Sequence, residues 1–265
     1  MIGKLILILI TAILLIPAGV AGYAFVLVIR RPPTALYEAR TRQPDFIPLA
    51  QIPKRQIELV LGLEDNYFYT HPGYDIDCIR KAMKKNSKSK RIVMGGSTIT
   101  QQLAKNLYFR FNHNYLRKAS EFLIALVLER RLGKDRILEM YLNIIYFGNG
   151  IYGISEAARF YFNKHVSGLN LNQMLILACI PAAPTRGNPI QHPDVFERIR
   201  NKRLDRLTPG KRPLITPAEA EEIRARDSSC LDPELKEPDE MTRNFPQTIP
   251  LINERFGPYA RKKST

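Results

Sequence analysis

Residues 94–106 read Met-Gly-Gly-Ser-Thr-Ile-Thr-Gln-Gln-Leu-Ala-Lys-Asn, so two glycines precede a stripe of hydroxyl, amide and ammonium side chains. Glycines allow a tight turn and a close approach of a ligand, and the free N–H groups at a helix start favour an anion. The segment therefore predicts a phosphate site. Thr98, Gln102 and Lys105 share one helix face and are expected to contact the ligand. A serine N-cap on an ordinary surface helix would explain a bare Gly-Gly-Ser-Thr equally well.

Helical spacing within residues 97–108 separates an apolar face from a polar one. Ile99, Leu103 and Leu107 recur every four residues, whereas the polar side chains fall on another face. We expect the apolar face to pack and the polar face to contact a ligand.

Two carboxylates flank this segment in the sequence, each beside apolar residues. Glu64 follows the run Leu-Val-Leu-Gly-Leu, and Glu121 precedes seven apolar residues. Acidic groups so close to apolar surface are rarely left unpaired. Sheltered carboxylates are candidates for general acid–base chemistry. The structural alternatives are a salt bridge at Glu64 and a helix-dipole interaction at Glu121.

Four motifs in this order resemble a known enzyme family. They are Glu-Asp-Asn-Tyr-Phe-Tyr-Thr-His-Pro-Gly at 64–73, the glycine segment at 94–106, Arg-Lys-Ala-Ser-Glu at 117–121, and Ile-Leu-Glu-Met-Tyr-Leu-Asn at 137–143 followed by Gly148. Together they resemble family 51 glycosyltransferases, the peptidoglycan transglycosylases that occur alone or as the N-terminal half of class A penicillin-binding proteins. The resemblance runs from about Pro53 to about Arg226.

The resemblance implies a lipid-linked substrate and a role for each carboxylate. The growing glycan on a polyprenyl pyrophosphate would be attacked at its anomeric carbon by the GlcNAc 4-hydroxyl of lipid II, in one inverting displacement that gives a β-1,4 link. Glu64 would be the general base. Glu121 would hold the pyrophosphate, directly or through a divalent cation, Mg²⁺ or Mn²⁺. No organic cofactor is implied.

Further residues follow from the same resemblance. Lys105, Arg117 and Lys118 would neutralise the leaving pyrophosphate as charge develops. The other implied substrate-binding positions are Asp65, Phe68, His71, Gly96, Ser97, Thr98, Gln102 and Asn106. By its residue type and place alone, His71 is better explained as a structural hydrogen-bonding residue.

Two places depart from the family pattern. The fifth motif, usually an arginine followed by Val-Leu, reads Arg-Asn-Lys-Arg-Leu-Asp at 200–205, and Ala182 and Gly187 replace a commonly polar residue and a common tyrosine. These changes put substrate contacts at that edge in doubt, not the reaction.

The predicted fold is mainly α. Helices are expected near residues 54–63, 73–86, 97–108, 115–131, 134–146, 150–163, 170–180, 191–207 and 216–226, separated by glycine and proline breaks. The resemblance implies a lysozyme-like helical lobe with a smaller membrane-associated jaw. We expect an anchor over 1–31, an extended linker over 32–52, the glycosyltransferase domain over 53–226 and an irregular tail over 227–265.

The N-terminal region predicts a membrane anchor. An almost uninterrupted apolar run from Leu5 to Ile29 exceeds the roughly 20 residues that cross a bilayer. A cleavable signal peptide is the alternative, but the run stays apolar where a mature domain should turn polar. Lys4 and Arg30-Arg31 flank the run, so charge does not settle orientation. The resemblance implies a single-pass protein of the cytoplasmic (inner) membrane with its domain on the outer, periplasmic face.

The net charge of +15 is unevenly distributed. Seven basic residues and no acidic one occupy 80–91, which reads as a nucleic-acid patch or a solvated loop. No nucleic-acid motif accompanies it, so anionic lipid head groups and lipid-linked pyrophosphate are the expected partners. Other cell-wall synthesis proteins are further expected partners.

The cysteines and histidines predict no metal site or disulfide framework. Cys78, Cys179 and Cys230 show no paired spacing, and the four histidines have no ligand spacing. Cys179 is expected to be a small buried hydrophobe.

A transpeptidase half does not fit after residue 226, so a monofunctional enzyme is expected. A muramidase-like hydrolase, which also uses two carboxylates, and a non-catalytic membrane scaffold are the alternatives.

Overall fold

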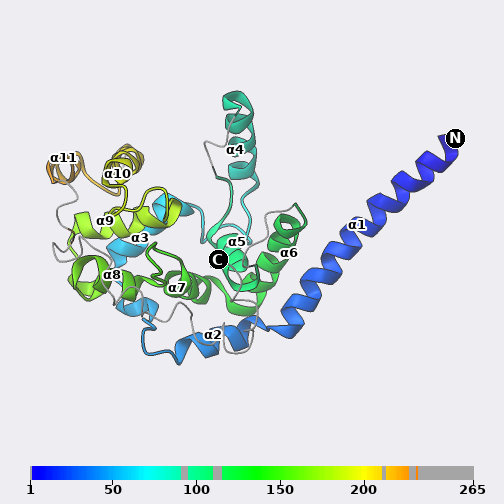
Figure 1. The fold of residues 1–265 in the computed structure, drawn as a ribbon, viewed down its shortest axis with the longest axis horizontal. Coiled ribbons are helices and arrows are strands. Elements are labelled where there is room, and N and C mark those ends of the chain that lie inside the picture. Colours follow the sequence, from blue (N-terminus) through cyan, green and yellow to red (C-terminus); the bar gives the residue numbers. More distant parts are fainter. Residues whose placement is uncertain (1, 91–94, 110–114, 211–212, 227–230, 232–265) are drawn as a thin grey trace, which may run out of the picture. The chain divides into compact units, whose positions relative to one another are not determined.

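A computed structural model describes residues 2–90, 95–109, 115–210, 213–226 and 231, with side chains from residue 15. The predicted mainly helical class is confirmed. The α-helices are α1 (Ile2–Arg30), α2 (Pro33–Thr41), α3 (Lys54–Glu64), α4 (Ile76–Ser89), α5 (Ile99–Tyr108), α6 (Tyr115–Leu132), α7 (Lys134–Ile144), α8 (Ile154–Phe162), α9 (Leu171–Cys179), α10 (Pro193–Leu207) and α11 (Pro217–Ala225) (Figure 1).

All nine helices predicted from the sequence are present, as α3 to α11. The largest shift is at α8, which begins at Ile154 rather than near residue 150 because Gly148, Asn149, Gly150 and Gly153 take positive φ values that a helix does not use. Among the described residues, extended pairing is confined to one bridge between Tyr146 and Tyr152.

The chain separates into two compact units, each built from two stretches of sequence. The first draws on residues 1–38 and 67–141, and the second on 39–66 and 142–265. The first therefore holds α1, α4, α5, α6 and most of α7. The second holds α3 and α8 to α11.

In the first unit, α5 packs on α6 through the face that the sequence predicted. Ile99, Leu103 and Leu107 are buried, and on α6 so are Ile124 and Leu128. The pairing gives a rigid pair of helices from which polar side chains can project at a fixed spacing.

The long apolar helix α1 also belongs to this unit. Its length and composition would allow it to cross a membrane. Phe25 and Ile29 are exposed, whereas Val20 and Ala24 are buried where α1 meets α6. The C-terminal half of α1 thus contacts the folded domain while still presenting apolar side chains outward.

In the second unit, α9 is the central helix. Its residues 172–179 are all buried, and α3, α8 and α10 pack around it (Figure 1). A helix that is apolar on nearly every side is suited to this position. The ends of α3, α9 and α10 are therefore fixed by one core.

The expectation of an extended linker over 32–52 was wrong for its first part. Residues Pro33–Thr41 form α2, because a proline is well tolerated at the first position of a helix, where its missing N–H costs nothing. A short 3₁₀ helix, Leu49–Gln51, follows. The two consecutive prolines at 32 and 33 had suggested extended backbone, but only the residue before a proline is restricted.

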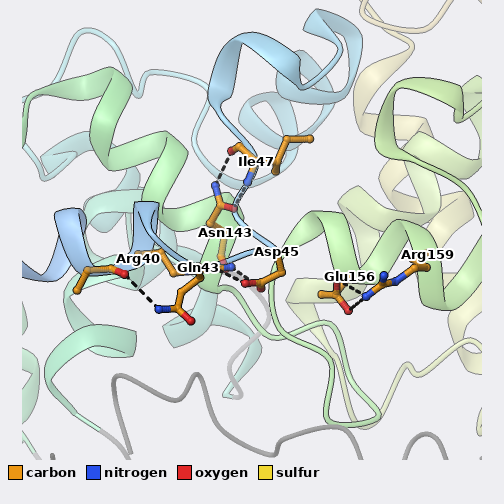
Figure 2. A network of polar contacts seen from close by, with 8 residues as sticks. Arg40, Gln43, Asp45, Ile47, Asn143, Glu156 and Arg159 are labelled. Carbon is orange, nitrogen blue, oxygen red and sulfur yellow. Dashed lines mark hydrogen bonds and ion pairs between the residues drawn. The ribbon is translucent and has the colours of Figure 1, made fainter.

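The segment after α2 is tied down by Asn143. The Asn143 side chain donates to the Ile47 carbonyl at 2.8 Å and accepts from the Ile47 N–H at 2.9 Å (Figure 2). Arg40 is 3% exposed; it pairs with Asp45 and donates to the Asn143 carbonyl. Residues 39–52 are therefore a bound part of the second unit.

Candidate active site

Glu64, the predicted general base, is the last residue of α3 in the second unit. Arg203 of α10 lies against it, with Nη1 2.9 Å from Glu64 Oε1, and the two side chains are only 13% and 11% exposed. Arg203 also donates to the Ala178 carbonyl at 3.4 Å. The expected shelter and pairing of Glu64 are confirmed, and its role as a base stays a prediction.

Glu121 is almost fully buried in the second turn of α6, in the first unit. Arg117 Nε lies 2.9 Å from its Oε1, and Lys118 Nζ lies 3.0 Å from its Oε2. The arginine contact is an ion pair without the alignment of a directed hydrogen bond. Because a helix dipole acts mainly in the first turn, these two cations outweigh it as partners of Glu121.

Lys118 extends this cluster to the glycine segment. Its Nζ donates to the Ser97 hydroxyl at 2.8 Å while it contacts Glu121. The structure thus brings together four of the predicted residues: Ser97, Arg117, Lys118 and Glu121. One carboxylate between two cations leaves one net positive charge, and the Lys118 side chain is 48% exposed. The cluster is therefore suited to attract an anion.

Two other predicted residues of the glycine segment face inward. The Thr98 hydroxyl donates to the Gly73 carbonyl at 2.7 Å, and with Gln101 it forms a capping box that starts α5. A Cβ on Gly96 would lie 3.1 Å from the Ile79 backbone of α4. Both positions have packing roles in this structure, and their predicted substrate contacts are not tested by it. The N-cap is Thr98, not the serine that the alternative had suggested.

The remaining polar residues of the segment lie nearer the surface. Lys105 is exposed, and Asn106 and Gln102 are half-buried. The Gln102 side-chain carbonyl accepts from the Tyr141 hydroxyl at 3.3 Å. Of these residues, Lys105 is the most accessible to a ligand.

Asp65, Phe68 and His71 are buried framework residues in this structure. The Lys134 ammonium lies 4.5 Å from the centroid of the Phe68 ring and donates to the His71 carbonyl. The His71 Nδ1 accepts a hydrogen bond from the Gly73 N–H at 3.0 Å. His71 thus makes a structural hydrogen bond, and its predicted contact with substrate stays a prediction. Asp65 is the C-cap residue of α3 in the second unit.

The sequence did not predict the role of Glu129, which links α5 to the lysine beside Phe68 and His71. Glu129 accepts from the Thr100 hydroxyl at 2.6 Å and pairs with Lys134 at 2.8 Å. Opposite charges on either side of Gly133 were a signal for the second contact. Arg203 was also missed, since its contact with Glu64 joins residues 139 positions apart.

Cys179 behaves as the buried residue that was expected. Burial raises the pKa of its thiol to about 12, so the reactive thiolate is suppressed at neutral pH. Cys78 is half-buried and, like Cys179, not in a disulfide. Cys230 lies outside the described residues.

The described residues contain no group of three or more His, Cys, Asp or Glu side chains that could hold a metal ion. Both Glu121 oxygens already contact cations, so a divalent ion would have to displace Arg117 or Lys118. Within the part of the chain that the structure describes, the side chains do not form a protein cage for the predicted cation.

Comparison with known proteins gives the family to which this chain belongs. The family model described as Transglycosylase matches residues 33–208. The chain is 45% identical to penicillin-binding protein 1F of Bacillus subtilis over 161 residues, covering 61% of this chain and 22% of that protein. It is 42% identical to penicillin-binding protein 1A of Aquifex aeolicus over 177 residues, covering 67% and 24%.

A shorter relative matches over more of its length. The biosynthetic peptidoglycan transglycosylase of Thiobacillus denitrificans is 41% identical over 159 residues, which cover 60% of this chain and 65% of that protein. The chain belongs to the transglycosylase family. It spans about a quarter or less of the two penicillin-binding proteins.

Proposed function

We propose that this chain polymerises peptidoglycan glycan strands from lipid II. The observation that supports this most is the cluster of Ser97, Arg117, Lys118 and Glu121, which joins the glycine segment to two cations in a chain of the transglycosylase family. A glycan hydrolase has no use for cations arranged to receive a diphosphate.

In the proposed reaction, Glu64 accepts the proton of the GlcNAc 4-hydroxyl of lipid II. The hydroxyl oxygen forms the new bond to the anomeric carbon of the lipid-linked glycan, and the bond from that carbon to the pyrophosphate oxygen breaks. The configuration inverts, and the leaving pyrophosphate carries away the electron pair. Proton transfer to a positioned side chain contributes roughly 10²–10⁴-fold to such reactions.

The cations act on the leaving group. Lys118 and Arg117 are preorganised by Glu121, so little reorganisation is needed when negative charge grows on the pyrophosphate. In this proposal Glu121 orients the two cations rather than contacting phosphate itself. Lys105, which is exposed on the neighbouring helix, supplies a further charge. The predicted divalent cation would be held chiefly by the substrate's own phosphate oxygens.

The membrane is the proposed location of the reaction. α1 would span it once, with the domain on the outer face of the cytoplasmic membrane. α4 is a second contact: Ile76 and Met83 are exposed beside a row of exposed lysines that includes Lys81, Lys84 and Lys85. An amphipathic basic helix of this kind favours anionic head groups.

The test is to incubate detergent-solubilised protein with labelled lipid II and Mg²⁺ or Mn²⁺, and separately with finished glycan. We expect wild-type protein to lengthen lipid II into glycan and leave finished glycan intact. Glu64→Gln should lower turnover at least about a hundredfold, since the amide keeps the shape but cannot accept the proton. Degradation of finished glycan, or more than a few per cent of turnover left in a folded Glu64→Gln protein, would contradict the proposal.

A further inference from the structure

The Glu64 carboxylate occupies an electrostatically unfavourable place. It is carried by the last residue of α3, and the carbonyl of Ala178, which shares its arginine, lies in the last turn of α9. The C-terminal end of a helix carries a partial negative charge from carbonyl groups without intrahelical partners. A carboxylate at such an end is repelled unless a cation compensates.

α10 supplies that compensation with two arginines, one turn apart. Arg203 contacts the Glu64 carboxylate at 2.9 Å and the Ala178 carbonyl at 3.4 Å. Arg206 donates to the Leu63 carbonyl at 3.3 Å, one residue before Glu64. The Arg203 side chain is 13% exposed, so solvent screens its pair with Glu64 much less than a surface pair.

We propose that Arg203 is the positioning residue of the candidate general base. It fixes the Glu64 carboxylate by Oε1 and offsets the negative ends of α3 and α9, so that the base is held in one orientation before substrate arrives. Arg203 acts through Glu64 and contacts no reacting atom. The proposal rests on the proposed function, because positioning a base matters only if Glu64 accepts a proton.

A planar guanidinium suits this role better than an ammonium. It can donate to the carboxylate and to a carbonyl at the same time in a fixed geometry, whereas an ammonium is a flexible point charge. Loss of the charge should therefore do more harm than exchange for lysine.

The experiment compares Arg203→Met, Arg203→Lys and Arg198→Met, the last as a control. Arg198 lies on the same helix, is exposed and donates to the Asp194 carbonyl, one turn earlier on that helix. With labelled lipid II, Arg203→Met should lower kcat about tenfold or more while KM stays within about twofold, since the interaction serves the reacting state rather than binding. Arg203→Lys should recover part of the loss, and Arg198→Met should match wild type. Equal kcat in the two methionine variants, or no recovery with lysine, would overturn the proposal.

A second measurement separates this proposal from the proposed function. The free energies of unfolding of wild type, Glu64→Gln, Arg203→Met and the double variant form a cycle that needs no substrate, and the contact predicts a coupling between positions 64 and 203. Additive effects would overturn the positioning role. If the cycle shows coupling but the wild-type protein never lengthens lipid II, the proposed function is overturned instead.

Discussion

At the scale of single residues, the two candidate carboxylates differ in how they are paired. Glu64 pairs with an arginine of a distant helix, whereas Glu121 pairs with two cations of its own helix, at i−4 and i−3. The second arrangement could be anticipated from the Arg-Lys-Ala-Ser-Glu spacing. The first could not, because nothing in local sequence indicates which part of α10 faces the end of α3.

Lys118 offers a direct test of the anion cluster. Lys118→Met removes the contact to Ser97 and one of the two cations on Glu121. We expect kcat on lipid II to fall about tenfold or more, with a smaller change in KM, because in the proposed reaction the lost charge would face a leaving group whose charge grows in the transition state. Lys54→Met, at a side chain 90% exposed on α3, is the control and should keep wild-type kinetics. Matching kinetics in both variants would contradict the leaving-group role.

Cys179 predicts a loss of stability at alkaline pH. Burial raises the pKa of its thiol from 9.0 to about 12, so between these values the unfolded chain loses the thiol proton while the folded chain keeps it. The stabilisation is complete below pH 9 and is lost as pH rises toward 12, at no more than about 1.4 kcal/mol per pH unit. Urea unfolding at pH 8, 9 and 10 should show a steeper decline for wild type than for Cys179→Ala. Parallel declines would show that this thiol is not the cause.

At the scale of elements, most helix positions could be predicted from helical periodicity and from the glycine and proline residues between helices. α5 has a clear apolar period, and the apolar runs of α6 and α9 lie between recognisable ends, so the positions of these three helices followed from the sequence. The sequence does not predict α2, because Pro32 and Pro33 favour an extended chain before them. The close packing of Gly96 against α4 was not foreseen either, because a glycine that makes room for a ligand and one that makes room for a helix look alike in sequence.

Gly96→Ala tests that packing. The new methyl group would lie 3.1 Å from the Ile79 Cα and 3.3 Å from the Ala82 Cβ, so α4 would have to move. Overpacking of this kind typically costs about 1–3 kcal/mol, and we expect a lower melting temperature. Gly95→Ala is the matched control, since no atom lies within 4 Å of its added Cβ. Equal melting temperatures for Gly96→Ala and Gly95→Ala would contradict the close packing of Gly96 against α4.

At the scale of the whole molecule, the apolar helix α1 is more than a tether. Tyr23 and Phe109 have ring centroids 6.3 Å apart, and the Tyr108 hydroxyl donates to the Arg31 carbonyl. Two truncations separate anchoring from packing. Removal of residues 2–14 should leave the melting temperature in detergent unchanged. Removal of residues 2–29 should lower it, because buried Val20 and Ala24 are lost at a cost of about 1–2 kcal/mol. Equal melting temperatures for the two truncated proteins would show that α1 does not stabilise the folded domain.

The amide of Asn143 has a consequence for how the chain resists proteases. A protease cleaves where the backbone opens locally, and Arg40 and Arg42 are potential trypsin sites in a stretch that contains several prolines. However, the Asn143 side chain forms two hydrogen bonds with the Ile47 backbone, 96 positions away in the sequence. We expect the bond after Arg42 to survive limited trypsin digestion in wild type and to be cut in Asn143→Leu, as read by mass spectrometry. Equal cleavage in both would contradict this. A fragment designed to begin at residue 53 would discard the partner of that amide and leave its donor and acceptor without the bonds they make here.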